Sequence, residues 1–279
     1  MYLDLEVHSV SMGHESQKDL YSKQFFDDEN RDSFLAARII VPLIIDLLHP
    51  ASVLDVGCGV GNWLHEFMVR GVEDVIGVDF YVDSRRLVFP VSKYRTIDLR
   101  KRFTLGRKFD VTICLEVAEH IPEESSIALV DSITETSDII IFSAAIPSQG
   151  GIHHINEQWA EYWSNLFNSK GFLPLDGLRG IIWADKRLSF WYRQNILIYI
   201  RSSVIKRMSM PDGGLRLSVV HPSNFVHWSW AFFKDNKHKG PAILRQWLRM
   251  LNRTLSYSLS LPDGRRKHPT PFMGGRMSE

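Results

Sequence analysis

Three glycines at alternate positions follow a short apolar run in the first quarter of the chain. The run spans residues 52–56, and Gly57, Gly59 and Gly61 follow it before a helical pattern that begins near Trp63. Glycine has no Cβ and tolerates positive φ, so a turn of this kind lets backbone amides approach a ligand closely where a helix begins. The stretch predicts a buried strand, a ligand-binding turn and a helix, in that order.

Acidic residues end the next two apolar runs. Asp79 follows residues 75–78, and Asp98 follows residues 94–97. An acid at the tip of the second strand can accept hydrogen bonds from a ribose diol. We interpret Asp98 as an acceptor for an adenine amino group, because polar contacts to a ring edge give a nucleoside site its specificity. The alternative is a loop carboxylate beside the arginines that follow it.

The spacing of the glycines separates two classes of cofactor. A nicotinamide site has the pattern Gly-x-Gly-x-x-Gly, whereas here the third glycine comes one residue earlier and residue 62 is Asn. The shorter turn leaves less room for a pyrophosphate and favours a smaller cofactor. Asp55 lies two residues before the first glycine and places a carboxylate where an ammonium group of the cofactor could lie, although an acid here can also cap the loop.

The stretch over residues 53–63, Val-Leu-Asp-Val-Gly-Cys-Gly-Val-Gly-Asn-Trp, resembles motif I of the class I S-adenosylmethionine-dependent methyltransferases. Residues 116–120, Glu-Val-Ala-Glu-His, are similar to the motif after the fourth strand in small-molecule methyltransferases of the ubiquinone-biosynthesis type. The resemblance covers roughly residues 20–200 and implies an α/β fold, a Rossmann-like, doubly wound sheet of seven strands that binds S-adenosyl-L-methionine. It implies that these residues contact the cofactor: Asp55, Gly57, Cys58, Gly59, Gly61, Asp79, Phe80, Asp98, Leu99 and Glu116.

Further motifs are similar to those of uncharacterised bacterial methyltransferases of polysaccharide and metabolite pathways. They are Tyr-Ser-Lys-Gln-Phe-Phe from residue 21, Gln-Gly-Gly at 149–151, Asn-Glu-Gln-Trp at 156–159 and Trp-Tyr-Arg-Gln-Asn at 191–195. That group has no single acceptor, so the resemblance implies a fold and a cofactor and leaves the acceptor and the attacking atom open.

Hydrophobic runs and turn residues place the remaining elements. We expect a helix from about residue 32 to 48, with Asp32 or Ser33 as its N-cap, and another over 124–133. Further strands are expected at 109–115 and 138–144, after Phe172, and at 196–200, the last of them opened by residues 191–195.

Candidates for proton transfer follow the predicted fourth and fifth strands. The ends of the first and fourth strands flank the crevice of a doubly wound sheet, so we expect Glu116, Glu119 and His120 between cofactor and acceptor. The loop over residues 146–159 adds His153, His154 and Glu157 on the same side. Histidine titrates closest to neutral pH and is the first choice of general base for an alcohol acceptor.

We rank His154 before His153 and His120, with Glu157 as a further candidate. The alternatives are a loop anchor for the His pair and, for His120, a residue that orients Glu116. The spacing of His153, His154 and Glu157 lacks the helical i, i+4 histidine pair of zinc enzymes, and two adjacent histidines rarely share one ion. The sequence therefore predicts no metal ligand.

Charge divides the chain into two unlike parts. Residues 1–200 hold 19 Lys and Arg against 28 Asp and Glu, whereas residues 201–279 hold 14 against 4. The second part includes an apolar pattern with arginines beside it over residues 242–261, which predicts an amphipathic helix. Packing on the domain or on a partner is the favoured role of this helix. Peripheral contact with an anionic membrane is the alternative, and nucleic-acid binding is the third choice.

Composition and boundaries complete the expectation. The predicted organisation is an N-terminal segment at 1–20, a methyltransferase domain at 21–202, a basic and aromatic extension at 203–261 and a disordered tail at 262–279. Cys58 and Cys114 do not suggest a disulfide framework, and the first 17 residues lack the pattern of a secretory signal. No uncharged apolar run reaches the ~18 residues of a membrane span. We expect a cytoplasmic protein.

Three functions remain at this point. The first is O-methylation of a small molecule or sugar-containing intermediate by S-adenosylmethionine. The second is a non-catalytic binding module that keeps the cofactor fold, against which the complete set of predicted cofactor residues argues. The third is RNA modification that uses the basic extension.

Overall fold

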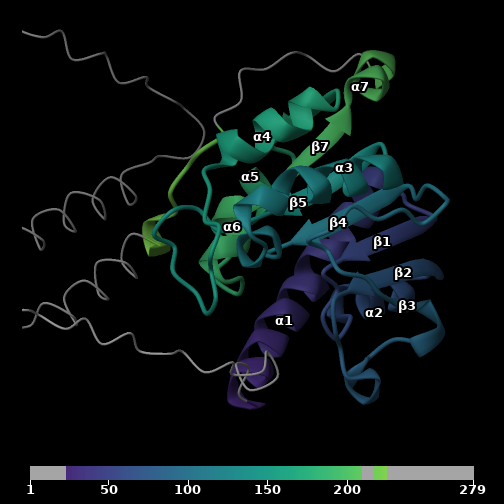
Figure 1. The fold of residues 1–279 in the computed structure, drawn as a ribbon. Coiled ribbons are helices and arrows are strands. Elements are labelled where there is room, and N and C mark those ends of the chain that lie inside the picture. Colours follow the sequence, from purple (N-terminus) through teal and green to yellow (C-terminus); the bar gives the residue numbers. More distant parts are fainter. Residues whose placement is uncertain (1–22, 209–216, 225–279) are drawn as a thin grey trace, which may run out of the picture. The chain divides into compact units, whose positions relative to one another are not determined.

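A seven-stranded mixed sheet carries the fold of the computed structural model, which describes residues 23–208 and 217–224. The strands run in the order β3-β2-β1-β4-β5-β7-β6, and Figure 1 shows β2, β1, β4 and β5 side by side across the sheet. Among these strands, β7 pairs antiparallel with both β5 and β6, and all the other pairs are parallel. Their bounds are β1 Ser52–Val56, β2 Asp74–Asp79, β3 Tyr94–Thr96, β4 Val111–Leu115, β5 Ile139–Ser143, β6 Phe172–Leu175 and β7 Leu197–Arg201. The prediction of a doubly wound, seven-stranded α/β sheet is confirmed.

Helices cover both faces of the sheet, so the hydrophobic core consists of two clusters. Their bounds are α1 Lys23–Leu48, α2 Asn62–Val69, α3 Ser126–Thr136, α4 Ala160–Ser169, α5 Arg179–Ile182, α6 Phe190–Asn195 and α7 Ser202–Met208. One buried cluster joins α1, α2, α5 and α6 to the sheet, and the other joins α3 and α4 to it. All residues of β1 and β4 are buried, as expected for central parallel strands covered on both faces.

The central strands end at one edge of the sheet, where loops bring the predicted site residues together. β1 pairs with β2 and with β4, so the loops that follow these three strands are neighbours. In a doubly wound sheet this point, where the strand order reverses, forms the ligand crevice. The fold thus places the glycine turn, the end of β2 and the residues after β4 at one site.

Some element boundaries differ from the prediction. The first helix begins at Lys23, so Asp32 and Ser33 lie within the helix and are not its N-cap. The residues from Lys23 to Asp32 are mostly polar and compatible with a helix. A search for regularly spaced apolar residues does not detect a helical segment of this kind. Residues 191–195 do not open the last strand. They belong to α6, and β7 starts at Leu197.

Parts of the predicted organisation lie outside the described residues. These are the N-terminal segment, most of the extension, including the helix expected over 242–261, and the tail over 262–279. The chain divides into two compact units, residues 1–221 and 222–279. The domain boundaries therefore stay predictions. Among the described helices, none is both long enough and apolar enough to span a membrane.

Gly77 gives a test of how tightly β2 packs. A Cβ at this position would lie 2.8 Å from Cys58 Sγ, from Leu64 Cδ1 and from Phe89 Cζ. We expect Gly77→Ala to lower the free energy of unfolding by about 1–3 kcal/mol, because overpacking forces neighbouring side chains from their rotamers. Chemical denaturation measures this change in the free energy of unfolding. Gly180→Ala is the matched control, since a Cβ there meets nothing within 4 Å, and its stability should be unchanged or higher by up to about 1 kcal/mol. Equal stability of the two variants would contradict the packing.

Candidate functional site

The glycine turn between β1 and α2 has the backbone conformation that its sequence predicts. Gly57, Gly59 and Gly61 have φ of 79°, 52° and 92°. Gly61 is the N-cap of α2 and offers no side-chain hydrogen bond to the first turn of the helix. Exposed amides at a helix N-terminus attract anionic groups, so this end of α2 suits a carboxylate.

Neighbouring side chains define where the crevice is open. A Cβ on Gly57 would meet Val117, and one on Gly61 would meet Phe89, in both cases closer than 2.5 Å. A Cβ on Gly59 would meet nothing within 4 Å. The turn is therefore covered by side chains at its two ends and is open at Gly59.

Asp55 and Asp79 are two neighbouring acids at this opening. Asp79 Oδ2 accepts a hydrogen bond of 2.9 Å from the Gly59 amide. Asp55 is 3% exposed, and its Oδ2 has no hydrogen-bond partner within the described part of the chain. Burial, and secondly the charge of Asp79, raises the pKa of Asp55 well above its usual value. Burial also raises the pKa of Asp79, against backbone N–H groups that lower it, first that of Gly59.

The remaining cofactor candidates differ in their burial and in their contacts with other side chains. Cys58 is a buried free thiol whose pKa is raised by burial and then by Asp55 and Asp79. Phe80 is 43% exposed, and the Arg100 guanidinium lies over its ring at 5.0 Å.

The carboxylate of Asp98 forms hydrogen bonds with Arg100. Its Oδ1 accepts bonds from the Arg100 backbone amide at 3.1 Å and from Arg100 Nε at 2.8 Å, and these contacts lower its pKa. Leu99 beside it is buried. The pairing with arginine was the alternative expectation for Asp98, and its role toward an adenine stays a prediction.

Glu116 follows β4 directly and is held by two amides. Its φ is 55°, and its backbone N–H is bonded to Ser143 of β5. Asn195 Nδ2 donates to Glu116 Oε1 at 3.1 Å, and Gln149 Nε2 donates to Oε2 at 3.3 Å. Burial raises the pKa of Glu116, and these hydrogen bonds and the one from Ser143 oppose the increase.

Glu119, His120 and His154 form a cluster next to Glu116. One side-chain N or O atom of each lies within 4.8 Å of one such atom of the other two. Glu119 is fully buried, and burial followed by the charge of Glu116 raises its pKa well above the usual value. Burial, and secondly His154, lowers the pKa of His120 to about 4, so its ring is neutral at pH 7. The rings of His120 and His154 meet edge to face at 4.9 Å.

His154 is the candidate base that the structure orients most firmly. Its Nδ1 lies 3.0 Å from Glu157 Oε1, and the Glu157 carboxylate accepts the backbone amides of Ser148 and Gly150 at 2.7 and 2.9 Å. A carboxylate on Nδ1 fixes the tautomer and leaves Nε2 as the acceptor. His153 is exposed, with φ of 58°. Of the four predicted catalytic residues, the structure brings His120, His154 and Glu157 together.

Sequence reasoning missed the amides that hold Glu116. Gln149 Oε1 accepts from Gln194 at 3.2 Å and from Asn195 at 2.9 Å, and Gln194 Oε1 accepts the backbone amide of His221 at 2.8 Å. All three amide residues are buried. Their signal was the two amide-containing motifs, Gln-Gly-Gly and Trp-Tyr-Arg-Gln-Asn, but no local pattern reveals that they meet across the fold.

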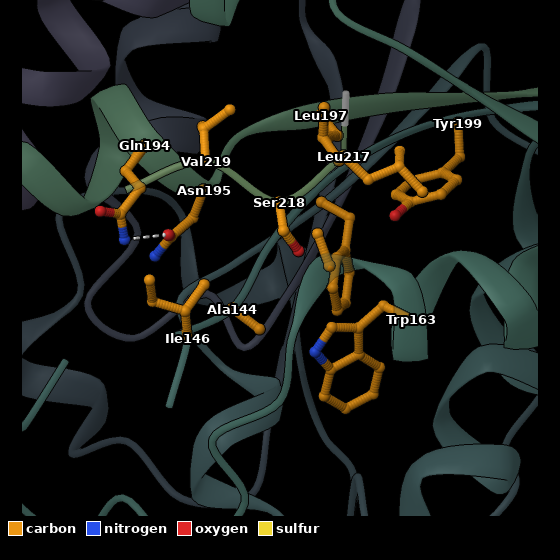
Figure 2. A pocket seen from close by; sticks show the side chains of 12 residues that line it. Ala144, Ile146, Trp163, Gln194, Asn195, Leu197, Tyr199, Leu217, Ser218 and Val219 are labelled. Carbon is orange, nitrogen blue, oxygen red and sulfur yellow. Dashed lines mark hydrogen bonds between the residues drawn. The ribbon is translucent and has the colours of Figure 1, made fainter. Parts of the chain in front are cut away.

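A small cavity lies on the other side of these amides. Figure 2 shows Gln194 and Asn195 at one end of it, joined by a 2.9 Å hydrogen bond, and Trp163 and Tyr199 at the other. Its volume of about 10 Å³, measured as the space open to the centre of a water molecule, is enough for a single water. The cavity is therefore too small to be the acceptor pocket.

The residues at the crevice fit S-adenosylmethionine. This ligand carries an ammonium group, a carboxylate and a ribose diol. The oxygen of Asp55 that lacks a partner suits the ammonium group, and the carboxylate of Asp79 suits the ribose hydroxyls. The open space at Gly59 and the start of α2 leave room for the carboxylate of the ligand. Asp55 is buried and Asp79 is half-buried beside it, so their mutual repulsion is costly unless a ligand or protons neutralise it.

Comparisons with known proteins agree with this assignment. The sequence model of a family described as "Methyltransferase domain" matches residues 28–181. A ubiquinone biosynthesis O-methyltransferase of Actinobacillus pleuropneumoniae is 27% identical over 133 residues, which are 41% of this chain and 56% of that protein. The match thus spans about half the length of the curated relative.

Two solved structures are also similar. A sugar N-methyltransferase from Streptoalloteichus has a TM-score of 0.49 at 17% identity, over 71% of this chain and 99% of that one. The magnesium protoporphyrin IX methyltransferase from Synechocystis has a TM-score of 0.46 at 21% identity, over 66% of this chain and 92% of that one.

Proposed function

This chain belongs to the methyltransferase-domain family, whose methyl donor is S-adenosylmethionine, and we propose that it methylates a hydroxyl oxygen of a small molecule or sugar-containing intermediate. The observation that carries the proposal is the cluster of Glu119, His120 and His154. The first two of these residues belong to the loop after β4, which flanks the cofactor crevice. A hydroxyl acceptor needs help to lose its proton, and these groups supply a base for that step if the acceptor binds beside them.

The donor's methyl group is already activated, so the protein contributes chiefly by positioning. Holding the acceptor oxygen in line with the methyl group supplies up to roughly 7–11 kcal/mol. Removal of the hydroxyl proton by a base adds about 10²–10⁴-fold. His154 fits this second task, because Glu157 holds its Nδ1 and Gly151, which has no Cβ, leaves space for its ring.

The same proposal gives each predicted cofactor residue a role. Asp79 binds the ribose hydroxyls, Asp55 and the amides at the start of α2 bind the methionyl part, and Asp98 with Leu99 borders the adenine. Phe80 and Cys58 lie beside the ligand, and Glu116 separates it from the acceptor. For Asp98 this requires the carboxylate to be shared with Arg100, to which it is now bonded.

Two other readings of the chain are weaker. A non-catalytic module would have no reason to keep His154 oriented by a carboxylate that two backbone amides support in turn. RNA modification depends on the basic extension, most of which lies outside the described residues. An amine acceptor would not need a base of this kind if it bound in its neutral form.

A screen of acceptors tests the proposal. Purified protein is incubated with methyl-labelled S-adenosylmethionine and panels of phenols, nucleotide sugars, primary amines and short RNA, and the products are analysed by mass spectrometry and NMR. We expect a product with the label in a methyl ether. Transfer only to nitrogen, carbon or RNA would contradict the proposed acceptor class, and the absence of transfer from a protein that binds the cofactor would favour the non-catalytic module.

A further inference from the structure

The cluster of Glu119, His120 and His154 has the composition of a metal site. Carboxylate and imidazole are the usual ligands of divalent first-row metals, and a set of two histidines and one carboxylate suits Zn²⁺, Mn²⁺, Fe²⁺ or Co²⁺. Ligand atoms around such an ion lie about 3.4 Å apart, for bonds of ~2.1 Å in tetrahedral geometry. The three ligand atoms lie within 4.8 Å of one another, so small side-chain rotations would bring them onto one ion.

Polar atoms of the cluster lack partners. Both carboxylate oxygens of Glu119 and Nδ1 of His120 are buried without a hydrogen bond of normal geometry among the described residues. The Glu116 carboxyl and backbone amides lie close enough to Glu119 to affect its pKa but do not satisfy these oxygens. Nearly all buried polar atoms in proteins are bonded. Three orphaned atoms in one cluster, in which Glu119 is buried and both histidines are half-buried, therefore indicate a missing ligand of opposite charge to the carboxylates.

The surroundings hold the cluster in place. The backbone carbonyl of Glu119 accepts the amides of Ile155 and Asn156 at 2.9 and 3.1 Å. The buried side chain of Asn156 donates to Ser126 Oγ at 3.0 Å. These bonds join the turn that carries Glu119 and His120 to the loop that carries His154, so the site is preorganised before any ion binds.

His154 also has the second contact that metal-bound histidines show. A ligating imidazole usually donates its other N–H to a carboxylate, which fixes the ring and raises its basicity. Glu157 lies 3.0 Å from His154 Nδ1, which leaves Nε2 for an ion. Glu116, bonded to Asn195 and Gln149, adds a second carboxylate beside the site.

We propose that Glu119, His120 and His154, with Glu116 beside them, bind one divalent first-row metal cation. The sequence alone predicts no metal, because the spacing of His153, His154 and Glu157 does not suit one ion. The structure replaces His153 and Glu157 with residues from the loop after β4. Binding of the ion does not depend on the proposed function. Its role does: at this position a cation would lower the pKa of the acceptor hydroxyl, and His154 would then serve as a ligand and not as the base.

Metal binding is measured directly on the full-length protein without an affinity tag. The protein is treated with a chelator, dialysed and titrated with Mn²⁺, and free Mn²⁺ is followed by electron paramagnetic resonance, with Zn²⁺ and Co²⁺ as competitors. We expect one Mn²⁺ per chain, displaced by Zn²⁺ or Co²⁺. Glu119→Gln and His154→Asn should each weaken binding by about tenfold or more. The control is Glu123→Gln, the same change at an exposed acid four residues away, which should bind like the wild type.

The outcomes separate this inference from the proposed function. Each variant is also titrated with S-adenosylmethionine, so that a variant that binds this ligand is known to be folded. Binding of Mn²⁺, Zn²⁺ or Co²⁺ by the wild type that is lost in both variants supports the site. Failure of a cofactor-binding wild type to bind any of the three ions overturns it and leaves the proposed function standing, as does unchanged ion binding in the variants. An ion-binding protein without affinity for S-adenosylmethionine would support the site and contradict the proposed function.

Discussion

His154→Asn is expected to lower the rate of methyl transfer by about 10²–10⁴-fold while S-adenosylmethionine binding stays within about twofold. The imidazole belongs to the cluster that we propose as the acceptor side of the crevice, and Glu157 orients it. The change removes either the proton acceptor or a ligand of the proposed ion, and both roles act on the acceptor hydroxyl. Single-turnover rates with the acceptor found in the screen, and calorimetry for the cofactor, provide the two measurements.

A matched control and the effect of added Mn²⁺ sharpen this prediction. His49→Asn makes the same change at an exposed residue just before β1, at the other end of that strand from the glycine turn, and should retain full activity. If His154 is the base, added Mn²⁺ leaves the rate of the variant unchanged. If it is a ligand, added Mn²⁺ partly restores the variant. Retention of more than about a tenth of the wild-type rate would exclude both roles.

Asp79→Ala is expected to weaken S-adenosylmethionine binding by roughly 10- to 100-fold. A hydrogen bond to a charged group contributes about 1.5–3 kcal/mol, and each 1.4 kcal/mol is a factor of ten in affinity. The Asp79 carboxylate already accepts the Gly59 amide beside the open part of the crevice, where ribose hydroxyls would reach it. Isothermal titration calorimetry measures the loss.

The control for Asp79 lies on the same strand. Asp74 is at the opposite end of β2, is exposed and pairs with Arg107, so Asp74→Ala should bind the cofactor like the wild type. Asp79→Asn should retain part of the affinity, because the amide oxygen still accepts a hydrogen bond from ribose but carries no charge. Equal affinities for Asp79→Ala and the wild type would remove Asp79 from the site.

The cofactor side of the fold could be predicted from sequence because its signals are local. Glycines that require positive φ, an acid at a strand end and buried β-branched runs each depend on a few consecutive residues. Gly57, Gly59 and Gly61 have the expected conformation, and Asp79 faces the turn. The order of the strands followed from resemblance to a known family, since no local pattern encodes it.

The proposed acceptor side could be predicted only in part, because its contacts join distant segments. Glu116 meets Asn195 and Gln149 across 79 and 33 residues of chain. The cluster likewise combines a turn near residue 120 with a loop near residue 154. Spacing along the chain ruled out a metal at adjacent histidines, but it could not show that His120 lies beside His154. Asp98 was read from its position at a strand end, and its engagement with Arg100 depends on side-chain geometry.

Titration of the full-length wild-type protein with S-adenosylmethionine in a calorimeter tests most directly whether the glycine turn with Asp55 and Asp79 is a cofactor site. We predict saturable binding at one site per chain, and a rise in the unfolding midpoint that corresponds to about 2.7 kcal/mol of added stability when free ligand is 100 times the dissociation constant. A protein that gives neither heat nor a shift of its unfolding midpoint at millimolar ligand would contradict the assignment.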